Sequence, residues 1–387
     1  MKKAAAGQIP RELALLIPLG IANHTALAGT RIIVSLEALK NGGSPFTVGV
    51  LMALFALLPM LCAIAAGRLS DRIGVRVPML AGSFGLAVGC AIPFFWRGLP
   101  ALYLSATLAG VSFMVFQLAT QRVAGEMGEV RDRVRNFGIL ALGYSVSGFI
   151  GPLLAGFSID HYGYAAAFAV MAVIALLPVA VLALNRFALP GPQREAVARQ
   201  GGVRALFRHR TLRQVFIVNS LLSAGWDLHT TFVPIYGQRV GLTASQIGMV
   251  LATFGAATFV VRLLMPWIAR RWTEQQVLTA ALVVGGAVFL VFPFSHDALV
   301  LAALSFVLGL GMGAGQPMVM SLLHTHAPAG RVGEAVGVRM SLVQSTSVGV
   351  PLLFGAVGSS LGLGPVFWSV GACLATGGWM MRRGVRT

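Results

Sequence analysis

Long apolar segments separated by short polar ones run along the whole chain. Each segment is close to the length, about 20 residues, at which an α-helix crosses the hydrocarbon core of a bilayer. The pattern predicts twelve membrane-spanning helices and leaves no stretch long enough for a soluble domain. Their expected ranges are 13–37, 46–67, 77–96, 99–120, 137–158, 164–185, 213–236, 245–268, 276–294, 298–322, 335–358 and 363–381.

The two halves of the chain repeat. A shift of 199 residues aligns Gln117 with Gln316 and the run 152–154 with 351–353, both of which read Pro-Leu-Leu. Glycine matches arise easily in Gly-rich apolar sequence, but the glutamine and proline matches do not. Further matches are Gly49 with Gly248, Phe55 with Phe254, Gly110 with Gly309, Gly156 with Gly355, Gly163 with Gly362 and Phe168 with Phe367.

The longest polar stretch divides the chain nearly in half. We therefore expect an all-α membrane protein with twelve transmembrane helices in two pseudo-symmetric six-helix bundles of parallel orientation. The expected parts are an N-terminal bundle at 1–185, a cytoplasmic linker at 186–211 and a C-terminal bundle at 212–387.

Composition and charge support the membrane interpretation. The chain is 57% hydrophobic and 11% charged, whereas soluble domains carry about 25% charged residues. Lys and Arg outnumber Asp and Glu by 29 to 12, and most of them fall on the side that holds both termini. The positive-inside rule places that side in the cytoplasm. We expect a multi-pass protein of a bacterial-type inner (plasma) membrane, with both termini cytoplasmic and no nucleic-acid partner.

Signatures of cofactor binding and catalysis are missing from the sequence. The three cysteines show neither a metal spacing nor a disulfide framework. His324 and His326 form an H-x-H pair without a nearby acid, which is a weak metal signal. No Walker-type loop, nucleophile–base pair, carboxylate cluster or channel filter appears. We expect no cofactor, no metal, no enzymatic activity and no direct use of ATP.

A short motif lies between the second and third expected helices, where residues 67–76 read GRLSDRIGVR. Two glycines permit a tight turn, and Asp71 can face a helix N-terminus or an arginine. The motif resembles the signature loop of the major facilitator superfamily, roughly G-x-L-a-D-r-x-G-r-k. The resemblance implies a conformational latch and a central cavity lined by the first and fourth helices of each half. The matching latch residues are Gly67, Leu69, Asp71, Arg72, Gly74 and Arg76.

The fifth expected helix carries GFIGPLLAG at 148–156. Gly151, Pro152 and Gly156 resemble the Gly-Pro motif of the superfamily's antiporters, which favours export. An ordinary kinked transmembrane helix is the alternative. In the fourth helix, Ala106 stands where drug–proton antiporters of the superfamily usually have an arginine, so the chain departs from the typical multidrug antiporter.

The first expected helix contains ionisable side chains. An ionised group at the centre of a span costs about 2.5–3.5 kcal/mol on insertion scales, so it is a candidate functional group. His24 and Arg31 fall on one helical stripe, and Asn23 precedes His24. For Arg31 two interpretations remain open, namely substrate binding or coupling, and a structural ion pair.

The seventh expected helix contains SAGWDLHTTF at 223–232. Asp227 and His229 are two residues apart and point to nearly opposite sides, so they form no acid–base dyad. Asp227 and Thr230 belong to one polar stripe, beside Trp226. The repeat aligns Thr230 with Arg31, which puts Asp227 about one turn from the level of Arg31. We expect a pair across the cavity, whereas His229 is either a hydrogen-bonded core residue or a functional one.

Glutamines mark the fourth and tenth expected helices. Gln117 and Gln121 share a stripe, and Gln316 is the counterpart of Gln117. Matched amides suit polar recognition of a substrate, or they form interhelical hydrogen bonds, typically worth about 0.6 kcal/mol. Arg262 and Arg339 lie near cytoplasmic helix ends, where snorkelling is the expected behaviour.

These features predict a secondary active transporter that moves a small organic solute by alternating access. Proton-coupled export is the first interpretation, and proton-coupled uptake or exchange of an organic anion is the alternative. Asp227 would carry the proton, because its surroundings change as the bundles rock. The substrate is either an anion held by Arg31 and histidines or an apolar compound. The expected partners are the substrate, protons and the lipid bilayer, and the expected state is a monomer. The aromatic and methionine candidates are Phe113, Met114, Phe116, Trp226 and Phe232.

Overall fold

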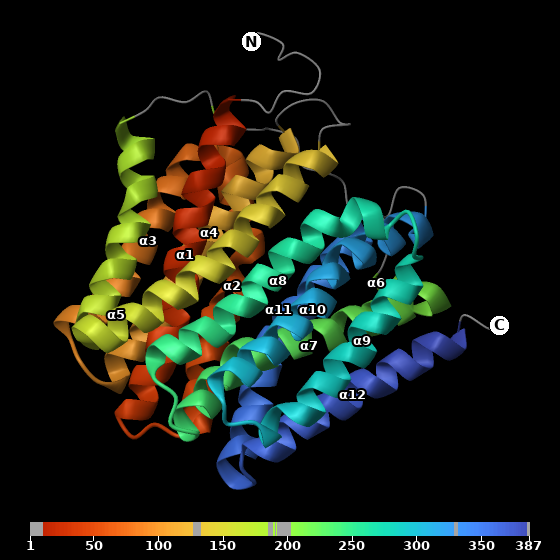
Figure 1. Cartoon of the computed structure of the whole chain (residues 1–387). Helices are drawn as coiled ribbons and strands as arrows, with labels where there is room; N and C mark the ends of the chain where they lie inside the picture. Colours follow the sequence, from red (N-terminus) through yellow and green to blue (C-terminus); the bar gives the residue numbers. More distant parts are fainter. Residues whose placement is uncertain are drawn as a thin grey trace.

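The computed structural model describes residues 11–126, 133–184, 189, 191, 203–328 and 332–384. These residues are almost entirely helical, with one 3-10 turn, η2 (Phe292–Phe294), and no strand. The helices pack side by side, with the early ones in red to yellow next to the late ones in green to blue (Figure 1). They are α1 (Arg11–Lys40), α2 (Pro45–Ile73), α3 (Arg76–Phe95), α4 (Leu99–Glu126), α5 (Arg133–Leu184), α6 (Val203–Arg208), α7 (Arg210–Arg239), α8 (Ala244–Ile268), α9 (Glu274–Val291), α10 (Ala298–His326), α11 (Val332–Ser360) and α12 (Leu363–Gly384).

Helix α5 consists of two spans. Its backbone leaves helical geometry at Gly163, where φ is +80°. Eight ranges of the described residues are long and apolar enough to cross a membrane, and the one in α5 has 50 residues. A helix of that length spans a hydrocarbon core of about 30 Å twice. When α5 is counted as two spans and the short α6 is left out, the described helices of near-spanning length agree in number with the twelve expected. Most of the expected linker lies outside the described residues.

The repeat extends to the signals that start helices. Ser44 caps α2 and Thr243 caps α8, and these positions are 199 residues apart. Each cap forms a capping box, in which the cap hydroxyl accepts the backbone N–H of Thr47 or of Gln246 at 3.2 Å. Both halves therefore begin their second helix with the same local chemistry.

The halves meet where α2 packs on α11 and α5 packs on α8. Glycines make this approach possible, because a Cβ at these positions would run into the backbone of the opposite helix. The two seams are counterparts under the shift of 199 residues, which supports the pseudo-symmetric architecture. The contacts are Gly49 with Pro351 and Gly355, and Gly248 with Pro152 and Gly156.

The signature loop turns at only one of its two glycines. Gly74 has φ +82°, a conformation that other residues rarely adopt. Gly67 lies inside α2 with open space around it, so the expected turn at Gly67 is wrong, because the helix continues to Ile73. Arg76 donates to the carbonyl of Leu182 in α5. Arg72 is exposed, and the side chain of Asp71 lies outside the described part of the structure.

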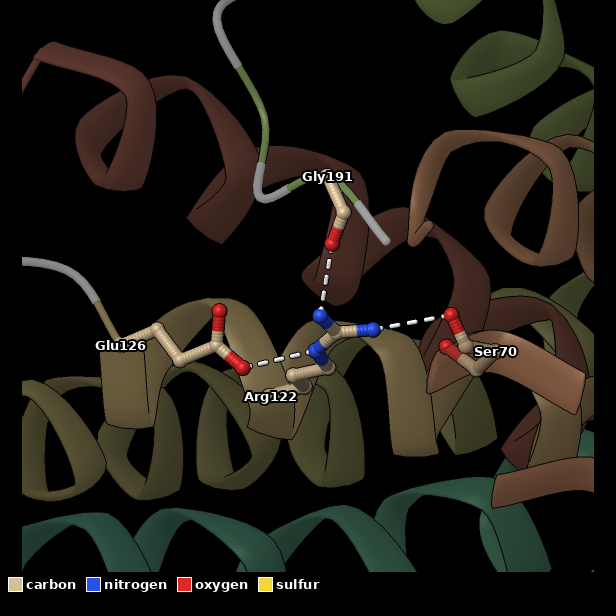
Figure 2. Close-up of polar contacts among 4 residues, drawn as sticks. All are labelled: Ser70, Arg122, Glu126 and Gly191. Carbon is tan, nitrogen blue, oxygen red and sulfur yellow. Dashed lines mark hydrogen bonds and ion pairs between the residues drawn. The ribbon is translucent and has the colours of Figure 1, made fainter. Parts of the chain in front are cut away.

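Arg122, at the end of α4, joins three segments beside this loop (Figure 2). Its Nη1 donates to the carbonyl of Ser70 at 2.8 Å, and its Nη2 donates to the carbonyl of Gly191 at 2.7 Å. Its Nε pairs with Glu126 at 2.7 Å. One guanidinium therefore ties the linker at Gly191 to α2 and α4.

Candidate functional site

A buried carboxylate lies at the middle of α7. Asp227 is 6% exposed. The hydroxyl of Ser347 in α11 donates to its two oxygens at 3.2 and 3.0 Å. No ion pair with Asp227 occurs among the described residues. A carboxylate has about four lone-pair sites, and a single hydroxyl leaves most of them unused. This group can therefore accept a proton or a donor from a bound molecule.

Arg31 brings a positive charge toward Asp227 from the other half of the chain. Its guanidinium carbon lies 5.9 Å from the ring centroid of Phe55. The charges of Arg31 and Asp227 interact, although the two side chains form no direct ion pair. The pair across the cavity that the sequence predicts is therefore not formed as a salt bridge in this structure. The space between these groups is set by α1 and α7, which belong to different halves.

His24 lies on the same helical stripe as Arg31, about two turns earlier in α1, among aromatic rings. Its ring centroid is 5.0 Å from that of Tyr144 and 5.4 Å from that of Phe113. Its Nδ1 is buried without a hydrogen-bond partner in the described residues. The imidazole also interacts electrostatically with Arg31 and Arg262. Within the described residues, three basic side chains therefore interact through their charges, and Asp227 interacts with one of them, Arg31.

Arg262 crosses from one half to the other, which the sequence did not predict. Its Nη1 donates to the carbonyl of Ala141 at 2.7 Å and to Ser145 Oγ at 2.8 Å, both in α5. Its Nη2 donates to Gln316 Oε1 at 3.4 Å. Snorkelling was the wrong expectation, because fixed acceptors on α5 lie within reach. The Nε of Arg262 is buried without a partner in the described residues, so it can still donate to an anionic group.

Arg339 also departs from the snorkelling expectation. It is 7% exposed, and its Nε donates to Asn219 Oδ1 at 2.9 Å. This bond joins α11 to α7 within the C-terminal half, so the residue stabilises packing there.

Two of the polar candidates turn away from Asp227. Asn23 is fully buried and donates to Ser83 Oγ of α3 at 2.6 Å. His229 is also fully buried, with its Nε2 3.0 Å from Ser305 Oγ and its ring stacked on Phe254 at 4.3 Å. Of its two open interpretations, the geometry matches a hydrogen-bonded core histidine.

The remaining candidates make contacts of their own. Gln117 approaches Tyr144, and Trp226 meets Phe254 edge-on at 4.7 Å. Thr230 directs its hydroxyl to the carbonyl of Trp226 at 3.1 Å, and Gln121 is half-buried on α4. Of the aromatic candidates, Phe116 and Phe232 are fully buried in the hydrophobic cores, so they do not line a pocket with the others.

The Gly-Pro motif lies between two helices. A Cβ at Gly151 would come within 3.0 Å of the Thr25 carbonyl and Ala28 Cβ of α1. On the other face, Pro152 and Gly156 form the seam with α8. The motif therefore brings α5 close to both α1 and the opposite half.

Sequence comparison places these features in a known group. A family model described as Major Facilitator Superfamily matches residues 16–351. The class C tetracycline resistance protein of Escherichia coli is 26% identical over 341 residues, covering 84% of each chain. The multidrug resistance protein MdtG of Salmonella paratyphi B is 22% identical over 322 residues, covering 81% of this chain and 80% of that protein.

Structural comparison gives the same fold. A peptide transporter POT solved in complex with sulfate has a TM-score of 0.80 at 15% identity and covers 99% of this chain and 96% of its own. A POT family transporter solved with 5-aminolevulinic acid has a TM-score of 0.81 at 12% identity. At these identities the likeness concerns the fold alone.

Proposed function

The chain belongs to the major facilitator superfamily and is a membrane transporter rather than an enzyme, and on this premise we propose that it exports a small organic solute in exchange for protons. Residues 1–185 and 212–387 act as two bundles that rock about a central binding site, joined by the linker at 186–211. The charge distribution supports an inner-membrane location with both termini in the cytoplasm.

The observation that carries this proposal is the environment of Asp227. A carboxylate in a membrane span is costly, and this one has a single neutral donor, Ser347. The positive charge of Arg31, in the other half, also acts on it. Rocking of the bundles changes the distance between the two charges, and so changes how readily Asp227 holds a proton. Proton binding is thereby linked to the conformation of the transporter.

Two features support export. The relatives include proteins named for resistance to tetracycline and to multiple drugs. Removal of a toxic compound from the cell is a direct route to resistance. The Gly-Pro motif of α5 lies on the seam between the halves, where it can influence how they separate.

Transport of an organic anion is the second candidate. The charges of His24, Arg31 and Arg262 interact, and Asp227 is a carboxylate whose charge interacts with that of Arg31. The excess of basic side chains favours a substrate that carries an acidic group, and the unpartnered Nε of Arg262 is a suitable donor. Uptake or exchange of such an anion uses the same residues.

Inverted membrane vesicles test coupling. The vesicles are acidified inside and monitored with a fluorescent pH probe, and a panel that includes tetracycline is added. An antiporter releases protons when its substrate is added. Asp227→Asn should abolish this release while substrate binding persists. Thr231→Val is the matched control, because Thr231 is a fully buried neighbour on α7 whose hydroxyl has no partner in the described residues. Unchanged proton release in Asp227→Asn would contradict the role of this carboxylate.

Ligand-induced thermal stabilisation of the purified protein separates the substrate classes. Arg31→Ala should remove stabilisation by anionic compounds and keep that by neutral ones if the substrate is an anion. Equal loss for both classes would instead assign Arg31 to structure or coupling.

A further inference from the structure

One carboxylate joins the two halves at the end of the molecule where α2 and α8 begin. Asp160 of α5 accepts the backbone N–H of Ala244 at 3.1 Å and that of Ser245 at 2.7 Å. These are the first two residues of α8, whose N–H groups have no acceptor within the helix. A carboxylate at a helix N-terminus forms charge-assisted bonds and is favoured by the helix dipole. Asp160 therefore holds α8 from the opposite half.

A second contact of the same kind lies at the start of α2. The hydroxyl of Ser359 in α11 accepts the backbone N–H of Phe46 at 2.9 Å. Pro45 is the first residue of α2 and has no N–H to donate. Only one donor is therefore available here, and the acceptor is neutral.

The two contacts are counterparts under the internal repeat. Asp160 and Ser359 are 199 residues apart, as are Phe46 and Ser245, so each half binds the start of the other half's second helix. The residue types differ between the two halves, so a search for identical residues at the 199-residue shift does not find Asp160 and Ser359 as counterparts. Their shared position and shared partner show that the structural role is retained.

The contacts lie beside the glycine seams. Gly156 is one turn from Asp160, and Gly355 is one turn from Ser359. The backbones of opposite halves touch at both glycines, so this end of the molecule is closed. Arg122 and the linker belong to the opposite end, where α2 and α4 finish.

We propose that Asp160 and Ser359 form a two-point clasp that keeps this end closed, and that both contacts must break when the end opens. The inference rests on the proposed alternating access. The clasp is unequal, because Asp160 supplies a charge and two bonds, whereas Ser359 supplies one neutral bond. Loss of a charged hydrogen bond costs about twice as much as loss of a neutral one. We expect Asp160→Asn to raise the ratio of open to closed molecules about tenfold or more, and Ser359→Ala about twofold to tenfold.

The test measures the distance between spin labels at the clasped end. Labels are introduced by Asn41→Cys and His296→Cys, which are exposed positions in different halves. The exposed native cysteines are removed by C62S and C373S, and buried Cys90 is kept. Asp160→Asn and Ser359→Ala should each add a longer distance to the distribution, in the order predicted.

Matched controls separate the clasp from ordinary helix capping. Asp297 accepts the N–H groups of Leu299 and Val300 of α10 at the same end, so Asp297→Asn removes a carboxylate charge from a helix N-terminus, as Asp160→Asn does, without touching the other half. Ser360 donates within its own helix, so Ser360→Ala is the control for Ser359. Both controls should leave the distances unchanged.

A gain-of-function variant covers the case in which the first variants fold poorly. Ser359→Asp places a carboxylate at the N-terminus of α2 and should shift the distribution toward the short distance, which damage to the fold does not do. The proposal is overturned if Asp160→Asn leaves the distribution unchanged, if Asp297→Asn shifts it equally, or if Ser359→Asp fails to favour the closed end. The measurement needs no substrate or proton gradient, so its outcome is independent of whether the proposed export is correct.

Discussion

Replacement of a single glycine by alanine at the seam between α5 and α8 should weaken the packing of the two halves. In Gly156→Ala, the added methyl would lie 2.9 Å from the carbonyl carbon of Ala244 and 3.0 Å from the Cα of Ser245. Carbon atoms in contact are about 3.5–4.0 Å apart. Because the opposing atoms belong to the backbone, they cannot rotate away. The helices must therefore separate by roughly 0.5–1 Å.

The magnitude follows from two opposing effects. Overpacking costs about 1–3 kcal/mol, while alanine in a helix interior recovers about 0.5–1 kcal/mol relative to glycine. Gly138→Ala is the matched control, because Gly138 lies in the same helix with nothing near an added Cβ. Both variants gain the same helical preference, so the difference in unfolding free energy between them, about 1–3 kcal/mol, reports the seam contact alone.

Thermal unfolding in detergent measures this difference. Gly138→Ala should unfold at or above the wild-type temperature, and Gly156→Ala should unfold below Gly138→Ala. Spin labels at the clasped end should also show a longer distance in Gly156→Ala. Equal unfolding temperatures for the two variants would refute the argument, because the seam would then tolerate a methyl group.

Three further changes test other parts of the structure. Ser347→Ala removes the donor to the buried carboxylate of α7 and should slow substrate-driven proton release, whereas Thr346→Val, whose hydroxyl bonds within its own helix, should not. Gly74→Ala forces a residue with a side chain into a positive φ and should cost about 1–2 kcal/mol of stability, measured as a lower unfolding temperature, while Gly67→Ala in the interior of α2 should raise it. Arg122→Ala should free the linker and speed its cleavage by limited proteolysis. Arg122→Lys, which lacks the planar guanidinium with its several donors, should restore protection only in part. Unchanged cleavage in Arg122→Ala would contradict the role of these hydrogen bonds in holding the linker.

The sequence predicted the helices because the thickness of the bilayer sets the number of consecutive apolar residues in each span. This requirement can be recognised within each segment, without knowledge of its neighbours. It also predicted the repeat, since Gln117 and Pro152 have identical counterparts. It predicted the stripe of α7 on which Asp227 lies, because helical periodicity separates this residue from His229.

Contacts between helices were the part that could not be predicted. The partner of Asp227 is Ser347, and that of Arg262 is α5; both depend on the rotation and spacing of helices that are distant in sequence. The polar run 344–347, which reads Gln-Ser-Thr-Ser, was the available signal in α11 for the first. For Arg262 the sequence predicts snorkelling, because the residue lies near a helix end, and the α5 acceptors that hold it leave no local trace in the sequence.

The paired seams have a consequence for the first half considered alone. Its α2 presents Gly49 and its α5 presents Gly156. The α2 surface contacts α11, which is the counterpart of α5, and the α5 surface contacts α8, which is the counterpart of α2. The interface is therefore isologous in its geometry, as in a two-fold homodimer. A first half expressed separately carries both complementary surfaces and has the geometry required to pair with a second copy of itself.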